Sequence, residues 1–388
     1  MHRWLGILLG VWVLLQAATG FIIVFHDQVN AWLHPSWFAA TPGDLGPQAA
    51  LDAAEAAHPN WNECGLTTPA TNGGVYSVCM EDAALEDYGI YEDYHVYVDP
   101  GTATVNGVGS ERHGFVSTVY RLHSNLLLEE GAFGVGGVAI VGWLGLIWLV
   151  VLLAGSAAGL TQRVRRWWYL VRVHRGQSTF RFTFDLHRTL GLVLFIPLAA
   201  IVLTGFTVTF PDQAAWVWEK LTPANGESVF FPPEDVVAKS KDRGAEPLDA
   251  DEVTRVLEQR YPDDTIAYLD TPKPGQQRAP VFAYLSLSTS YDPWNTQRGY
   301  AGNMLVLLDQ YTGRELWSGD PSEFSAWTQF YDLWAFQIHA GGFGRTPTRL
   351  LWLVIAAGVC VSAFTGYRMW ILRRRTAKQR RQADLSRP

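Results

Sequence analysis

Four long apolar stretches alternate with polar segments along the chain. They cover residues 4–25, 132–160, 189–210 and 346–367, and Arg349 is the only charged residue inside them. Each stretch reaches or exceeds the roughly 20 residues that an α-helix needs to cross a bilayer. The pattern predicts an integral, α-helical membrane protein with four transmembrane helices.

The two long polar segments show a shared order of elements. In each, an amphipathic helix is followed by strands whose apolar residues alternate with polar ones. The helices are expected at 47–58 and 248–261, and the strands at 75–105, 266–269, 281–287 and 304–308. The last strand of each segment ends in a turn sequence, Asp99–Thr102 or Asp309–Gly313. We therefore expect an α+β domain in each segment.

The first and third apolar stretches are related by duplication. Residues 2–25 and 187–210 align without a gap and share His-Arg-x-Leu-Gly at one end and Thr-Gly-Phe at the other. Apolar composition explains shared Leu and Phe residues, but not these two motifs. The sequence thus predicts two tandem repeats, each made of a transmembrane helix, an outer α+β domain and a second transmembrane helix.

Charge gives the expected orientation. Arginines and lysines gather in two segments, 161–186 and 373–388, and basic segments beside membrane helices remain on the cytoplasmic side. Both termini are then cytoplasmic and the two long loops are extracytoplasmic. The first loop is acidic, which excludes a nucleic-acid partner there. The predicted division is transmembrane helices at 1–25, 132–160, 187–210 and 346–372, outer domains at 26–122 and 211–338, and the two basic cytoplasmic segments.

Cysteine placement agrees with that orientation. Cys64 and Cys79 both lie in the first outer loop, where an oxidising compartment permits a disulfide between them. A metal site is the alternative, and it would need further ligands such as His58 and His95. Cys360 lies inside the last apolar stretch, where a cysteine acts as a small packing residue.

Several motifs together carry a family resemblance. They are the HRWLG…TGF pattern, the D-x-x-T-G turn at Asp309–Gly313, the R-L-H at Arg121–His123 and the I-H-A-G-G-F-G at Ile338–Gly344. With these motifs the chain resembles the PepSY-associated transmembrane proteins. Within that family it is similar to the siderophore-iron reductases of the bacterial inner membrane, which carry haem between their helices. The first outer domain departs from the pattern, with Asp-Pro-Gly-Thr at Asp99–Thr102.

Four histidines are the candidate haem ligands. His2 and His187 stand at equivalent cytoplasmic ends of the first and third helices, and His123 and His339 precede the second and fourth helices on the outer side. A pseudo-twofold axis along the membrane normal would bring each pair together. Two facing imidazoles give six-coordinate haem b, so we expect two haems. His26 is a rival outer ligand, and His174 is a possible substitute for His2.

Other residues around the expected haems have weaker assignments. Arg3 and Arg188 stand beside the inner pair, where they can bind haem propionates, anchor the helices by the positive-inside rule, or do both. Pro197 is expected to kink the third helix. No C-x-x-C-H motif occurs, so the haem would not be attached covalently.

The resemblance implies a haem-dependent ferric-chelate reductase that passes electrons outward to a ferric siderophore or another ferric chelate. No nucleotide or flavin fingerprint occurs in the sequence, so electrons would come from a separate donor, either membrane quinol or a cytoplasmic reductase. No side chain is assigned a catalytic role. The alternative is a non-enzymatic membrane anchor whose outer domains bind or inhibit an extracytoplasmic protein.

Overall fold

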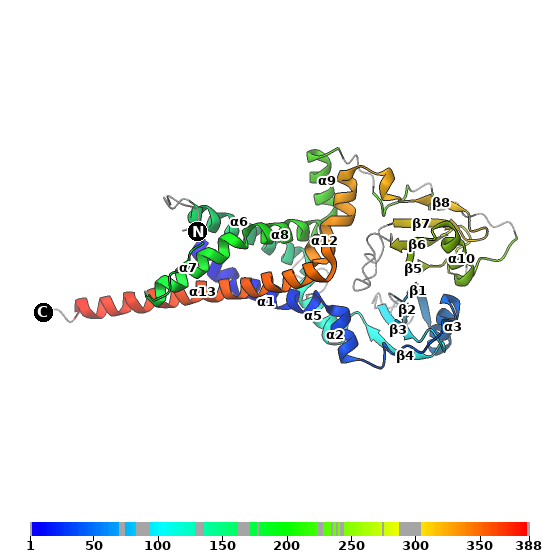
Figure 1. Ribbon diagram of the computed structural model, residues 1–388, viewed down its shortest axis with the longest axis horizontal. Helices are drawn as coiled ribbons and strands as arrows, with labels where there is room; N and C mark the ends of the chain where they lie inside the picture. Colours follow the sequence, from blue (N-terminus) through cyan, green and yellow to red (C-terminus); the bar gives the residue numbers. More distant parts are fainter. Residues whose placement is uncertain are drawn as a thin grey trace. The chain divides into compact units, whose positions relative to one another are not determined.

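The computed structural model describes residues 2–69, 74–82, 93–128, 136–160, 171–176, 178–223, 228–233, 236–237, 240, 244–273, 275–286 and 304–385. The chain divides into two units (Figure 1). The first unit contains Met1–Phe25, Val119–Ala214 and Phe336–Pro388, and the second contains His26–Thr118 and Ala215–Ala335.

Helices make up the first unit. They are α1 (His2–Ile23), the end of α5 (Phe115–Asn125), α6 (Gly137–Leu160), α7 (Thr179–Val193), α8 (Phe195–Thr209), α12 (Ala335–Ala340), the short η5 (Gly342–Gly344) and α13 (Arg345–Leu385). Among the described residues, α1, α6 and the η5–α13 segment are long and apolar enough to cross a membrane. The pair α7 and α8 adds a fourth crossing if the two helices form one bent span.

The bend between α7 and α8 measures 53° and lies at Leu194. Its physical cause is Pro197 in the first turn of α8, which has no N–H to donate to the carbonyl four residues earlier. The bend expected from Pro197 is therefore present. The helix begins earlier than the predicted start at residue 187. Helix α7 starts at Thr179, and the side chain of Ser178 caps it by accepting a hydrogen bond from the Arg181 N–H.

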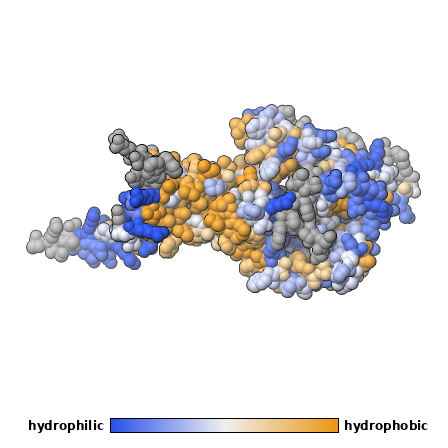
Figure 2. All heavy atoms as spheres, in the orientation of Figure 1, coloured by the Kyte–Doolittle hydropathy of each residue, from blue (hydrophilic) through white to orange (hydrophobic). Residues whose placement is uncertain are grey.

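Few apolar side chains of the first unit are fully buried, and many are exposed. Its core is formed by Val13 of α1, Leu194 and Leu198 at the bend, and Trp352, Ile355 and Val359 of α13. The outward sides of the same helices carry exposed apolar residues such as Leu8, Ile196 and Val354, and this surface is coloured hydrophobic in Figure 2. Such a surface is suited to lipid rather than water.

An eight-stranded antiparallel sheet forms the centre of the second unit. The strands are β1 (Trp61–Thr67), β2 (Tyr76–Asp82), β3 (Asp93–Val98), β4 (Val105–Ser110), β5 (Thr265–Asp270), β6 (Pro280–Ser286), β7 (Met304–Asp309) and β8 (Glu315–Ser318). Their order is β4-β3-β2-β1-β5-β6-β7-β8. The two α+β segments therefore share one sheet, joined where Leu66 pairs with Leu269 and Thr67 with Tyr268.

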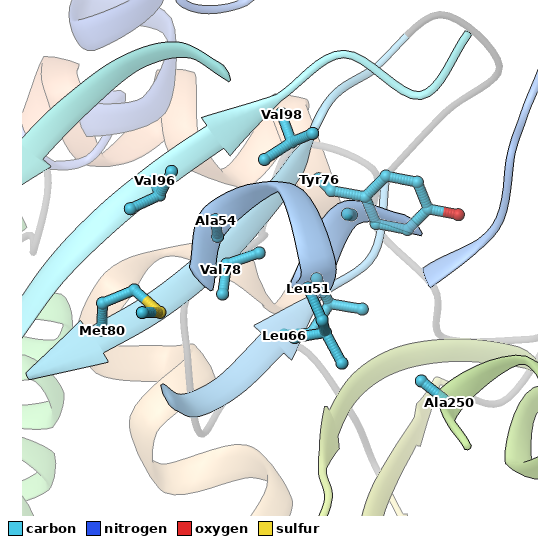
Figure 3. Packing of buried hydrophobic residues seen from close by; sticks show 10 residues of the cluster. Leu51, Ala54, Leu66, Tyr76, Val78, Met80, Val96, Val98 and Ala250 are labelled. Carbon is cyan, nitrogen blue, oxygen red and sulfur yellow. The ribbon is translucent and has the colours of Figure 1, made fainter. Parts of the chain in front are cut away.

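Each half of the sheet is covered by its own helix. Helix α3 (Pro47–Ala57) packs Leu51 and Ala54 onto Val78, Met80 and Val96 of the first half, as Figure 3 shows. Helix α10 (Ala250–Arg260) packs in the same way on the second half through Val253 and Leu257. Two hydrogen bonds join the N-terminal ends of α3 and α10. The Ala250 N–H donates to Gln48 Oε1 and the Gln48 N–H donates to Asp251 Oδ1, each at 3.0 Å.

The turns that close β3 and β7 have the same hydrogen bonds despite different sequences. Asp309 accepts from the Tyr311 N–H at 3.0 Å and the Thr312 hydroxyl at 2.9 Å. Asp99 accepts from the Gly101 N–H at 3.2 Å and the Thr102 hydroxyl at 2.8 Å. The fifth residue is left-handed in both turns, with φ of 64° at Gly313 and 52° at Ala103. Ala103 is thus the position where the first turn departs from the D-x-x-T-G pattern.

The remaining helices of the second unit are short. They are α2 (His26–Leu33), the part of α9 (Pro211–Leu221) from Ala215 onward, η3 (Pro321–Glu323), α11 (Ala326–Gln329) and the π-helix η4 (Phe330–Trp334). Helix α2 leads into the segment with Trp37, whose ring stacks on Tyr97 of β3 at a centroid distance of 5.6 Å.

Candidate functional site: two facing histidine pairs

His2 of α1 and His187 of α7 face each other, with ring centroids 6.1 Å apart and an angle of 57° between the ring planes. Each ring is oriented from behind by a backbone carbonyl. His2 Nδ1 lies 3.0 Å from Val151 O on α6, and His187 Nδ1 lies 2.9 Å from Ser362 O on α13. A carbonyl only accepts, so Nδ1 carries the proton and Nε2 is the nitrogen available to a metal.

His123 of α5 and His339 of α12 form a second facing pair with ring centroids 6.5 Å apart. His339 Nδ1 lies 2.9 Å from Ile201 O on α8, and His123 Nδ1 lies 2.9 Å from the Thr19 hydroxyl oxygen on α1. Since that hydroxyl donates its proton to Leu15 O at 2.7 Å, its oxygen accepts from His123. The outer pair thus has the same tautomer as the inner pair.

A glycine on a neighbouring helix lies against each of the four rings. A β-carbon at these glycines would approach the Cε1 atom of the histidine to 2.6 Å at Gly155 (His2), 3.3 Å at Gly366 (His187), 3.3 Å at Gly20 (His123) and 2.9 Å at Gly205 (His339). For three of the rings, the carbonyl that binds Nδ1 belongs to the residue four positions before that glycine. One helical turn of the neighbouring helix therefore supplies both the contact and the acceptor.

A cavity of about 320 Å³ surrounds the inner pair. Arg3, Arg188 and Arg373 line it together with Gly6 and Gly191, which are equivalent in the sequence alignment. A β-carbon at either glycine would meet no atom within 4 Å, so each faces open space one turn after its histidine. Cationic side chains around an apolar cavity are suited to a flat apolar ligand that carries carboxylates.

An ion-pair network lies next to this cavity and was not found by sequence reasoning. Asp185 of α7 is fully buried, and its Oδ2 atom lies 2.8 Å from His174 Nδ1 and 3.1 Å from Arg181 Nε. Its Oδ1 atom lies 3.3 Å from Nη2 of Arg188, whose side chain is 9% exposed. The only sequence signal was an acidic residue two positions before a candidate ligand.

This network also shows where two of the sequence-derived candidates lie. His174 bonds to Asp185 rather than facing His187. Arg188 is held between Asp185 and the carbonyl oxygen of Arg172, which accepts from Nη2 at 3.1 Å. Arg3 differs, because its guanidinium lies 4.7 Å from the ring centroid of Trp4. The two arginines that align in the sequence therefore contact different groups: Arg188 binds a carboxylate and a carbonyl, and Arg3 lies over an aromatic ring.

The remaining sequence candidates lie in the second unit. His26 Nε2 lies 3.1 Å from Asp27 Oδ1. Cys64 and Cys79 form a disulfide between β1 and β2, with Cα atoms 5.0 Å apart. His58 stacks on Trp61, and His95 Nε2 lies 3.2 Å from Glu111 Oε1. The residues considered for a metal at the cysteine pair therefore have other partners.

Both histidine pairs fit a haem iron. Two imidazoles that bind one metal ion from opposite sides, at metal–nitrogen distances of about 2 Å, have ring centres roughly 6 Å apart. The observed separations are 6.1 and 6.5 Å. Ligating histidines also donate their second ring nitrogen to an oxygen acceptor, as all four do here.

Comparison with known proteins supports a family assignment for nearly the whole chain. The family model described as the PepSY-associated TM region matches residues 1–373. No curated protein matches the chain. Apolar helices that can cross a membrane and a second, α+β unit agree with this match. The chain therefore belongs to the PepSY-associated transmembrane family.

Proposed function

We propose that this protein is a di-haem b transmembrane reductase that passes electrons outward to a ferric siderophore or a similar ferric chelate and releases ferrous iron. In this proposal the bent pair α7–α8 is one span, so four spans form two tandem repeats in the bacterial inner membrane. Both termini are cytoplasmic, and the sheet-containing unit is extracytoplasmic. The observation that carries the proposal is the paired arrangement of His2 with His187 and His123 with His339.

The protein's contribution is to hold and orient the ligands. Haem b supplies a one-electron carrier that needs no proton donor at the iron. Val151, Ser362 and Ile201 fix three of the histidine tautomers through their carbonyls, and Thr19 fixes the fourth. Arg3 and Arg188 line the cavity of the inner site and would bind the haem propionates there.

The chemical step at the outer side is a single electron transfer. One electron converts Fe³⁺ in the chelate to Fe²⁺, and no covalent bond is formed or broken other than those between iron and its chelator. Hard oxygen ligands hold Fe²⁺ less tightly than Fe³⁺, so the reduced ion leaves. A separate donor, membrane quinol or a cytoplasmic reductase, would supply the electron. This scheme requires no acid–base side chain.

Anaerobic mixing tests the reaction. The purified protein, reduced with dithionite and freed of excess reductant, is mixed with a ferric hydroxamate in the presence of a ferrous-specific chromogenic chelator. We expect the haem bands to reoxidise and one Fe²⁺ to appear per electron lost, while the gallium form of the same hydroxamate leaves the bands reduced. Haem bands that remain reduced with every ferric chelate tried would contradict the proposed reductase activity.

A further inference from the structure

Two short helical segments of the second unit pack together through one tryptophan. Trp218 of α9 donates from Nε1 to Trp327 O at 3.0 Å, and its ring stacks on Phe330 with centroids 5.4 Å apart. This contact joins α9 to the segment formed by α11 and the π-helix η4. It uses one side of α9 and leaves the other sides exposed.

The exposed sides carry large apolar residues, which we call the aromatic patch. Its members are Trp216, Val217 and Leu221 of α9 and Trp327, Phe330 and Trp334 of the α11–η4 segment. Trp216 is 62% exposed and Leu221 is 76% exposed. Trp327, Phe330 and Trp334 have the spacing of residues on one helix face. So many exposed tryptophans and aliphatic residues in one area mark an interaction surface.

The supporting side of the π-helix is polar and hydrogen-bonded. Asp332 accepts from the Val229 N–H at 2.8 Å and from the Ser228 hydroxyl at 2.9 Å. Burial raises the pKa of Asp332, although both donors act in the opposite direction. The two hydrogen bonds attach η4, which carries Phe330 and Trp334, to the segment that contains Ser228 and Val229.

Chain connectivity sets how far the patch can lie from the membrane. Helix α8 ends at Thr209 and α9 begins at Pro211, so Trp216 follows the apolar helix by seven residues. In helical geometry seven residues cover about 10 Å, and even an extended chain covers only about 25 Å. At the other edge of the patch, Trp334 precedes the apolar segment that starts at Gly342 by eight residues.

We propose that the aromatic patch lies in the headgroup layer of the bilayer, on the side where α8 ends, and that its partner is the lipid surface itself. Tryptophan is enriched at this depth because its ring is apolar and its N–H is polar. The helical periodicity of α9 places Lys220 between Trp216 and Val217 on the exposed face, and a lysine there reaches lipid phosphates with its terminal amine. Glu219 lies on the opposite side of the helix from Val217 and Leu221, because residues two positions apart on an α-helix are separated by about 200° around its axis.

Nitroxide labels at Leu221 and Glu219 test this placement, because both side chains are exposed and only one belongs to the patch. The full-length chain carries Cys360→Ala, which removes the free cysteine, and either Leu221→Cys or Glu219→Cys. Each variant is labelled and reconstituted in phosphatidylcholine vesicles. Power-saturation EPR then compares collisions with oxygen, which concentrates in lipid, and with a neutral nickel chelate, which stays in water.

We expect the ratio of oxygen to nickel accessibility to be at least three-fold higher at position 221 than at position 219. Equal, water-like ratios at both positions would overturn the proposal. A second outcome would also overturn the proposal and assign the patch to a second copy of the chain. In that outcome both reagents are excluded at position 221, and dipolar broadening disappears when labelled protein is diluted with unlabelled protein. This test uses no haem signal, so its outcome is independent of the proposed reductase activity.

Discussion

The two halves of the chain perform the same structural tasks with different residues. In both halves a histidine of the first helix lies against a glycine of the second helix, Gly155 in one and Gly366 in the other. Among the described residues, a buried carboxylate, Asp185, supports the adjacent arginine in the second half alone. The sheet halves also differ, because the first has a disulfide and a left-handed Ala103 where the second has Gly313.

This difference separates what the site needs from what each half adds. A facing imidazole, an acceptor for Nδ1 and a glycine beside the ring occur in both halves, so these are the requirements of ligand positioning. The Asp185 network and the disulfide occur once each among the described residues. We therefore expect variants of the shared features to affect cofactor binding and variants of the unshared features to affect stability.

The largest effect is expected at the glycines of the inner pair. Gly155→Ala places a methyl group 2.6 Å from His2 Cε1 and displaces that ring, whereas Gly366→Ala places one 3.3 Å from His187 Cε1, which needs only a small adjustment. We expect inner-site haem affinity to fall about 10- to 100-fold for Gly155→Ala. Haem titration of the apoprotein measures it, and equal affinities for the two variants would remove this distinction between the halves.

Asp185→Asn tests the feature that is present in the second half alone. The substitution leaves Arg188 buried without its counter-charge, so we expect the free energy of unfolding to fall by about 3 kcal/mol. The matched control is Asp212→Asn, because Asp212 is exposed at the start of α9. Calorimetric unfolding of the detergent-purified chain gives both values. An unchanged transition for Asp185→Asn would show that Arg188 is solvated.

Exchange of the two turn residues compares the sheet halves. Ala103 has φ of 52° and carries a β-carbon in the left-handed region, so Ala103→Gly should stabilise the second unit by about 1 kcal/mol. Gly313→Ala should destabilise it by about 1 kcal/mol or more, since a β-carbon there also meets Val256 at 3.0 Å. Chemical denaturation followed by near-ultraviolet circular dichroism measures both changes, which should have opposite signs.

The remaining prediction is a pH-dependent effect of Glu63 on β1 in the sheet. Burial, with contributions from the Asp270 and Glu55 carboxylates, raises the pKa of Glu63 from 4.5 to about 7. The folded chain then keeps a proton that the unfolded chain releases, so this contribution to stability is complete below pH 4.5 and is lost as pH rises to about 7. Relative to Glu63→Gln, the wild-type melting temperature should therefore fall between pH 5 and 8. Parallel pH profiles for the two proteins would contradict this assignment.

Much of this organisation follows from local patterns in the sequence. Apolar run length predicts the membrane helices, and the repeated His-Arg motif predicts that His2 and His187 are equivalent. The union of the two α+β segments in one sheet was not predicted, because it depends on a few contacts between residues far apart in the sequence. They include the two residue pairs between β1 and β5 and the hydrogen bond from the Tyr268 hydroxyl to Cys64 O. Contacts of this kind leave no periodic signal.

The supporting residues of the site were also beyond sequence reasoning. Small residues on the helices predict close helix packing or room for a flat macrocycle, but they do not predict that four glycines lie against individual histidines. Asp185 and Thr19 act through partners 11 and 104 residues away along the chain. Such long-range contacts depend on which helices are neighbours, and the hydrophobic pattern of a membrane helix does not specify its neighbours.

The most direct test of the central claim is the haem content of the full-length protein and of two single variants, measured as the pyridine haemochrome after expression with added haem. We predict about two b-type haems per chain in the wild type, about one in His187→Ala, and about two in His174→Ala, whose histidine binds Asp185 rather than facing His187. A colourless wild-type protein, or a His187→Ala variant that keeps the full haem content, would contradict the assignment of the histidine pairs as haem ligands.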